Sequence, residues 1–250
     1  MYRSVELNVN GRLLRGCVRA PEGNAPFPTA IFYHGFTVDR IGMQRLHELF
    51  ARALVDQGFA CVRFDFYGLG ESEGDFNEMT LGHEIEEAKA IYRWTAEQDF
   101  CDPENLYITG HSQGGLICTV IAPELQPKAM VLWAPALNMY YGASERARTM
   151  MGPTENGWDI EGLELSREYI DEIRRMDLRA MALGYSGPTL LIHGEKDELV
   201  PVDCAYEYGD IYGSTMKLVI IPGANHQFRS LNWKKQVYDA STDFLKAQLS

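Results

Sequence analysis

The chain has 250 residues, of which 46% are hydrophobic and 23% charged, and its formal net charge is −12. The length fits one large α/β domain or at most two small ones, and the composition indicates a soluble globular protein. The acidic balance argues against a nucleic-acid partner, since phosphate groups bind clustered Lys and Arg side chains. The longest apolar stretch, residues 129–137, is too short to span a membrane, so we expect no membrane partner.

The N-terminal segment and the cysteines both predict a cytoplasmic protein. Residues 1–16 contain no apolar signal-peptide core, so we expect no signal peptide. The cysteines are scattered and form neither a C-x-x-C pair nor a metal-ligand spacing, which predicts buried free thiols and no metal site. The five are Cys17, Cys61, Cys101, Cys118 and Cys204.

Strand and helix patterns alternate along most of the chain. A β-hairpin is predicted first, because Asn10-Gly11 separates two strand-like runs. The later strand segments are almost continuously apolar, which indicates a mostly parallel sheet with helices on both faces. The predicted strands are 29–36, 59–66, 105–110, 129–135, 188–194 and 217–223, and the predicted helices are 43–58, 79–98, 113–122, 201–212 and 233–248.

Residues 135–187 interrupt this alternation. The segment is longer than a crossover between two strands needs, and it shows one helical pattern at 165–183 and no strand pattern. It follows the carboxyl end of a predicted strand, where open α/β sheets place their ligand crevice. We therefore predict a single domain over residues 1–250, with an inserted lid at about 135–187.

The sequence Gly110-His111-Ser112-Gln113-Gly114 matches the pattern G-x-S-x-G between a predicted strand and a predicted helix. A serine in this place either caps the helix or acts as a nucleophile. Side chains at positions 110 and 114 would clash with neighbouring elements in the tight turn that exposes a nucleophile. The partners elsewhere in the chain must decide between the two roles, because a serine hydroxyl needs a base to take its proton.

His226 and Asp197 are the predicted base and acid. His226 lies in a loop directly after a late apolar strand, and Asp197 lies in the loop after strand 188–194. Both fit the hydrolase order of serine, acid and histidine. Glu195 and Glu198 are the alternative acids.

The other histidines are predicted to have structural or surface positions. We expect His34 to anchor its loop, His111 to point away from Ser112, and His193 to be packed in the core. His47 and His83 are expected on the surface of their helices.

An oxyanion hole is predicted from two backbone N–H groups. One belongs to Gln113, at the start of the helix after Ser112, and the other to Phe36, in the loop His34-Gly35-Phe36-Thr37 that ends the strand-like run 29–36. Gly35 allows the turn that directs the Phe36 N–H inward. Asp65 is predicted to hold loop backbone by hydrogen bonds.

With these residues in order, the whole chain resembles the α/β-hydrolase superfamily. The motifs HGFT, VRFDFYGLGESEG, GHSQGG, HGEKDELVP and IPGANHQF look like those of small bacterial serine esterases of the cinnamoyl/feruloyl type. The resemblance implies that the enzyme releases hydroxycinnamic acids from plant-derived esters and carries an inserted subdomain at 135–187. It also implies that Tyr169 contacts the phenolic end of the substrate. Trp158 and Tyr140 are further pocket candidates, with packing of the insertion as their alternative role.

The sequence therefore predicts a carboxylesterase that acts through an acyl-enzyme on a small-molecule ester, without a cofactor or a metal. The alternatives are a monoacylglycerol or short-chain lipid esterase, a thioesterase, and a ligand-binding protein of hydrolase fold without turnover. A peptidase is disfavoured, since nothing resembles an acidic pair for amine recognition. A homodimer is left open.

Overall fold

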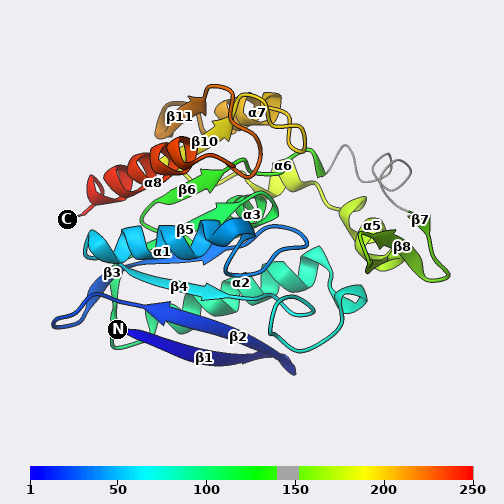
Figure 1. Cartoon of the computed structure of the whole chain (residues 1–250), viewed down its shortest axis with the longest axis horizontal. Coiled ribbons are helices and arrows are strands. Elements are labelled where there is room, and N and C mark those ends of the chain that lie inside the picture. The colour runs from blue at the N-terminus through cyan, green and yellow to red at the C-terminus, as the bar shows by residue number, and fades with distance from the viewer. Residues whose placement is uncertain (140–151, 250) are drawn as a thin grey trace.

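The computed structural model describes residues 1–139 and 152–249, and in that part of the chain an eight-stranded sheet forms the centre (Figure 1). Its strand order is β1-β2-β4-β3-β5-β6-β10-β11. β1 and β2 form the predicted hairpin, β2 pairs antiparallel with β4, and the other pairs are parallel. The strands are β1 Tyr2–Val9, β2 Arg12–Arg19, β3 Phe27–Tyr33, β4 Ala60–Phe64, β5 Cys101–His111, β6 Met130–Trp133, β10 Thr189–Gly194 and β11 Met216–Ile221.

Helices cover both faces of this sheet, as the apolar strands predict. Side chains of α1 and α8 share one apolar core, and those of α2, α3 and α7 belong to the other. The helices are α1 Leu46–Asp56, α2 Leu81–Ala96, α3 Gln113–Leu125, α7 Asp203–Tyr212 and α8 Leu231–Lys246, with short 3-10 helices at Met43–Arg45, Phe76–Glu78 and Gly213–Thr215. All five cysteines are buried free thiols.

The inserted segment differs from its prediction. It contains an antiparallel sheet of β7 Gly152–Pro153, β8 Gly157–Ile160 and β9 Leu163–Ser166, although no strand was expected. Glu161 and Gly162 form a two-residue turn between β8 and β9, with φ of 52° and 91°, the left-handed pair that a tight hairpin requires.

The predicted helix 165–183 is also wrong, because two short helices stand in its place. They are α5 Arg167–Ile173 and α6 Leu178–Met181. The Asp177 carboxylate accepts a hydrogen bond from the Ala180 N–H at 3.0 Å and so begins a new helix inside the helical pattern. In Figure 1, α5, β7 and β8 of the insertion lie beyond one end of the main sheet, at the right of the view.

Candidate active site

Ser112 lies at a sharp turn between β5 and α3, with φ of 57° and ψ of −119°. Its side chain makes no capping hydrogen bond to α3. A Cβ atom at Gly114 would lie 2.1 Å from the Tyr33 carbonyl oxygen, and one at Gly110 would lie 2.3 Å from the Gly114 oxygen. The turn therefore needs both glycines. Ser112 does not cap the helix, and its backbone is strained, as is typical of a residue at a functional site.

Asp197 and His226 meet at the end of the sheet where β10 and β11 finish. His226 Nδ1 lies 2.7 Å from Asp197 Oδ2, and Asp197 Oδ1 accepts the N–H groups of Leu199 and Val200 at 2.9 and 2.8 Å. Burial alone would raise the pKa of Asp197, but hydrogen bonds from His193, His226 and the Val200 N–H hold that pKa well below its usual range. An ionised Asp197 fixes the proton of His226 on Nδ1 and leaves Nε2 as the basic nitrogen.

Ser112 and His226 line the same cavity, which has a volume of about 320 Å³. Among the described residues no hydrogen bond joins the Ser112 hydroxyl to His226, and such contacts are often long before substrate binds. Gly35 also borders the cavity, where an added Cβ would lie 3.1 Å from the Ser112 Cβ. The rest of the cavity has an apolar wall, which the sequence did not indicate. This wall includes Met139, Ile160, Leu165, Ile170, Ile173, Leu199 and Val200.

The two predicted oxyanion residues lie beside Ser112. Gln113 is the first residue of α3 and is fully buried, and Phe36 lines the cavity. The loop of Phe36 is held by His34, whose Nε2 accepts the Phe66 N–H at 3.1 Å and whose Nδ1 lies 2.9 Å from the Gly35 oxygen. Burial lowers the pKa of His34, so the ring is neutral and donates from Nδ1. His34 thus has the anchoring position expected of it.

His111 and His47 occupy positions that the sequence did not indicate. His111 Nε2 lies 2.9 Å from the His226 carbonyl oxygen, and its buried ring lies 4.9 Å from the ring of His226. Burial lowers the pKa of His111 to about 3, so the neutral ring donates this hydrogen bond. His47 is buried rather than exposed, because the first turn of α1 packs its ring 4.5 Å from that of Phe32.

His83 and His193 complete the histidines. His83, expected on the surface, is half-buried. His193 is packed as predicted, and its Nε2 lies 2.8 Å from the Val200 oxygen and 3.4 Å from Asp197 Oδ2. The ring therefore steadies the loop that carries Asp197. Asp65 holds loop backbone as expected, since its carboxylate accepts the N–H groups of Arg40 and Glu71.

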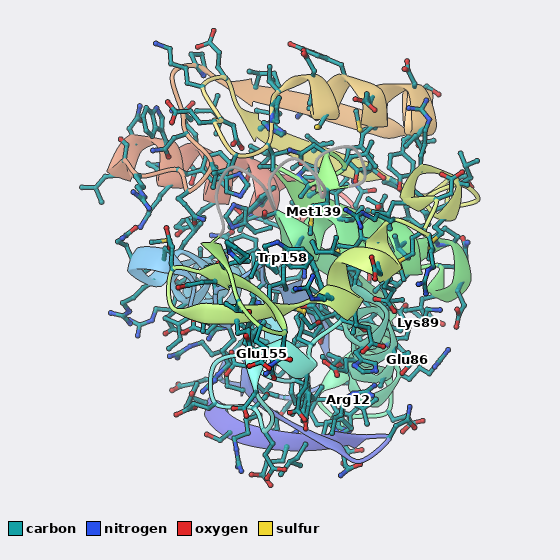
Figure 2. All side chains as sticks on the ribbon, turned by 90° about the vertical axis from the view of Figure 1, so that its right-hand side faces the viewer. Arg12, Glu86, Lys89, Met139, Glu155 and Trp158 are labelled. Carbon is teal, nitrogen blue, oxygen red and sulfur yellow. The ribbon has the colours of Figure 1, made fainter. Side chains whose placement is uncertain are left out.

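The lid candidates have three different outcomes. Tyr169 lines the cavity, and its hydroxyl donates to Gln113 Oε1 at 2.6 Å. Trp158 does not line the cavity; it lies on β8 of the insertion (Figure 2), where the Arg167 guanidinium sits 5.5 Å from its ring. Trp158 therefore packs the insertion, which was its alternative role. Tyr140 lies outside the described residues.

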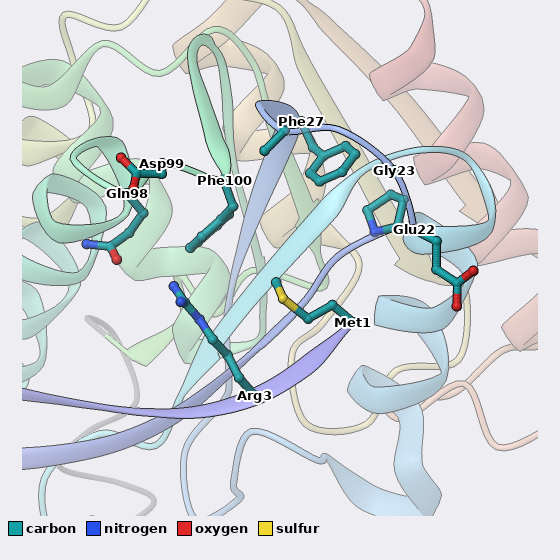
Figure 3. A pocket seen from close by; sticks show the side chains of 10 residues that line it. Met1, Arg3, Glu22, Gly23, Phe27, Gln98, Asp99 and Phe100 are labelled. Atoms are coloured by element: carbon teal, nitrogen blue, oxygen red, sulfur yellow. The ribbon is translucent and has the colours of Figure 1, made fainter.

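A second hollow of about 620 Å³ lies near the N-terminus, between Met1, Arg3, Phe27 and Phe100 (Figure 3). None of the candidate catalytic residues borders it. The described residues contain no group of three or more His, Cys, Asp or Glu side chains placed to hold a metal ion. Within the same ranges, no helix has the length and apolar character needed to cross a membrane.

Known proteins support this architecture. The structure superposes on Est1E from Butyrivibrio proteoclasticus, solved with ferulic acid bound, with a TM-score of 0.87, 26% identity and 98% of each chain covered. Lysophosphatidylserine lipase ABHD12 from Danio rerio is 27% identical over 88% of this chain and 58% of its own length. The human mitochondrial palmitoyl-protein thioesterase ABHD10 is 24% identical over 81% of this chain and 68% of its own length.

The chain spans only 33% to 58% of the length of several curated relatives that it matches. A family model described as the prolyl oligopeptidase family matches residues 47–250, which is most of the chain. The expected α/β-hydrolase fold is confirmed by the sheet, its helices and the structural neighbours. The chain therefore belongs to the prolyl oligopeptidase family, within the α/β-hydrolases.

Proposed function

We propose that this hydrolase cleaves carboxylic esters through an acyl-enzyme on Ser112. His226 Nε2 takes the Ser112 proton while Oγ attacks the ester carbonyl, and the N–H groups of Phe36 and Gln113 hold the oxyanion. The C–O bond to the leaving alcohol then breaks, and His226 returns the proton to that oxygen. Water attacks the acyl-enzyme with His226 again as base, which releases the acid and restores Ser112.

The observation that carries this proposal is the Asp197–His226 hydrogen bond of 2.7 Å beside a strained Ser112, with Ser112 and His226 on one cavity. Asp197 is ionised and buried, so it can stabilise the imidazolium that forms when His226 accepts a proton.

A hydroxycinnamate ester is the substrate class we propose. The rings of Phe36 and Tyr169 stack at 5.4 Å and both border the cavity, so they offer an aromatic wall next to Ser112. Planar aromatic acyl groups pack well against such a wall. The likeness to Est1E, whose structure holds ferulic acid, supports the same class.

A lipid ester or a thioester is the second candidate. The far wall of the cavity is aliphatic, with Leu165, Ile170 and Ile173, and Leu199 at its border is 41% exposed. A fatty acyl chain would bury its apolar surface against these residues. The similarity to ABHD12 and ABHD10 supports this candidate to the same degree.

Two experiments test the proposal. A fluorophosphonate probe should label the folded protein and fail to label the variant Ser112→Ala; a folded wild-type protein that resists labelling would exclude Ser112 as the nucleophile. A panel of methyl ferulate, monoacylglycerol, palmitoyl thioester and p-nitrophenyl acetate then ranks kcat/KM. A value for methyl ferulate far below those for the aliphatic substrates would replace the hydroxycinnamate proposal with the lipid or thioester one.

A further inference from the structure

Tyr169 touches both residues that carry the proposed oxyanion donors. Its ring stacks on Phe36 at 5.4 Å with 28° between the planes, and its hydroxyl donates to Gln113 Oε1 at 2.6 Å. Tyr169 belongs to α5 of the insertion, whereas Phe36 follows β3 and Gln113 begins α3. One side chain of the insertion thus joins the two halves of the oxyanion hole.

The Gln113 amide is fixed from its other end by Glu84. Gln113 Nε2 donates to Glu84 Oε2, so Gln113 Oε1 faces Tyr169 as the acceptor of its hydroxyl proton. Glu84 is buried in α2, and burial raises its pKa well above the usual range. Leaving a buried amide group without one of its hydrogen-bond partners costs free energy. This chain of hydrogen bonds therefore favours a single orientation of the Gln113 side chain.

A second contact fixes α5 on the core. The Glu172 carboxylate accepts the Gly82 N–H at 2.8 Å, in the first turn of α2 and two residues before Glu84. A Cβ at Gly82 would lie 2.4 Å from Glu172 Oε1, so the close approach depends on glycine. With Glu172 bound here, α5 presents Tyr169 to Gln113.

We propose that Tyr169 is a positioning residue: when α5 is seated on α2, its hydroxyl holds Gln113, and so the Gln113 oxyanion N–H, while its ring supports Phe36. This inference rests on the proposed function, since it assumes a Ser112 acyl-enzyme. It differs from the role that the family resemblance implies, in which Tyr169 contacts the phenolic end of the substrate. A positioning role affects every ester, whereas a phenol contact affects hydroxylated aromatic acyl groups alone.

The variant Tyr169→Phe separates the two roles, because it keeps the ring on Phe36 and removes the hydroxyl. Its matched control is Tyr185→Phe, which removes another buried hydroxyl. That hydroxyl donates to the Pro127 oxygen at 3.0 Å, and Tyr185 does not line the cavity. The substrate is p-nitrophenyl acetate, whose acyl group is too small to reach a phenol subsite. A phenylboronate inhibitor, which forms a tetrahedral adduct on the nucleophile, reports on the oxyanion hole directly.

We expect Tyr169→Phe to lower kcat for p-nitrophenyl acetate about 10-fold, with little change in KM, since small misplacements of catalytic groups are costly. Phenylboronate affinity should fall by a similar factor, and Tyr185→Phe should change neither value. Gln113→Met, which keeps the backbone N–H, should give the same loss, and the double variant should lose no more than either single one. If Tyr169→Phe does not fold, Gln113→Met alone carries this expectation.

Three results would overturn the inference. A wild-type kcat in Tyr169→Phe would do so, and so would a loss confined to methyl ferulate, or additive losses in the double variant. In each case an active wild-type enzyme leaves the proposed function standing. A wild-type protein that neither hydrolyses p-nitrophenyl acetate nor reacts with fluorophosphonate would remove both proposals.

Discussion

Replacing Asp197 by Asn tests the proposed acid through the proton of its histidine. Asp197 Oδ1 accepts two backbone N–H groups, from Leu199 and Val200, at 2.9 and 2.8 Å. These donors require an acceptor, so the Asn carbonyl oxygen takes this place and its NH₂ group faces His226 Nδ1. His226 Nδ1 must then accept a hydrogen bond, which moves the ring proton to Nε2 and removes the base for Ser112.

We expect a large loss of kcat, because the substitution changes the tautomer of His226 and not only a packing contact. In a Ser-His-Asp enzyme the equivalent change lowers kcat about 10⁴-fold, which corresponds to roughly 5 kcal/mol of transition-state stabilisation. The fold should survive, since Asn has nearly the same volume as Asp. The assay is kcat for p-nitrophenyl acetate, with the melting temperature measured on the same preparation.

Glu198→Gln is the matched control for this variant. Glu198 is the exposed neighbour that the sequence leaves open as the acid, and we expect its variant to keep wild-type kcat. The reasoning is refuted if a folded Asp197→Asn enzyme retains more than a tenth of the wild-type kcat. It also fails if Glu198→Gln shows the large loss instead.

Two further predictions concern stability. Gly114→Ala should lower the free energy of unfolding by about 1–3 kcal/mol in urea titrations, since its Cβ would meet the Tyr33 oxygen at 2.1 Å. Gly152→Ala, whose Cβ would meet no atom of the described residues within 4 Å, should leave the free energy of unfolding unchanged. Glu48→Gln should cost about 3 kcal/mol at pH 7, because buried Arg63 loses its carboxylate partner, and this difference from wild type should shrink as the pH falls from 4.5 towards 2. A difference independent of pH would contradict the ion-pair explanation.

The pH window follows from the Glu48 pKa. Burial would raise this pKa, but hydrogen bonds from Arg19 and Arg52 and the charge of Arg63 outweigh burial and lower the pKa to about 2. A carboxyl with a depressed folded-state pKa stabilises the fold above its ordinary value, here 4.5. Its contribution is lost as the pH falls through the folded-state value, where the group gains a proton.

Local patterns of residue types in the sequence were sufficient to predict much of the core fold. Asn10-Gly11 specified a hairpin, and Thr80, a residue type that favours helix starts, caps α2 by accepting the His83 N–H at 3.1 Å. Apolar strands that alternate with helices were sufficient to predict a parallel sheet covered on both faces. These features depend on neighbours in the chain or on burial averaged over a whole element, and both can be read from residue types.

Local patterns were misleading in the insertion. Residues 157–166 pair as a hairpin, although their side chains do not alternate cleanly, and the Glu161-Gly162 turn was the signal that could have indicated it. The helical pattern at 165–183 continues through Asp177, but the Asp177 side chain starts a new helix there. Marginal short elements such as these depend on their contacts with the core more than on propensity.

The sequence by itself determined the order of Ser112, Asp197 and His226, each after its own strand, and the glycines of the turn. Tertiary structure alone decided which side chains surround them. His111 reaches the His226 carbonyl across 115 residues, and Tyr169 reaches Gln113 across 56. Such contacts join positions whose residue types have ordinary local explanations, since a buried histidine or tyrosine on a helix looks the same whatever it touches. Their partners are fixed only when the strands pair into the sheet and the insertion packs against α2.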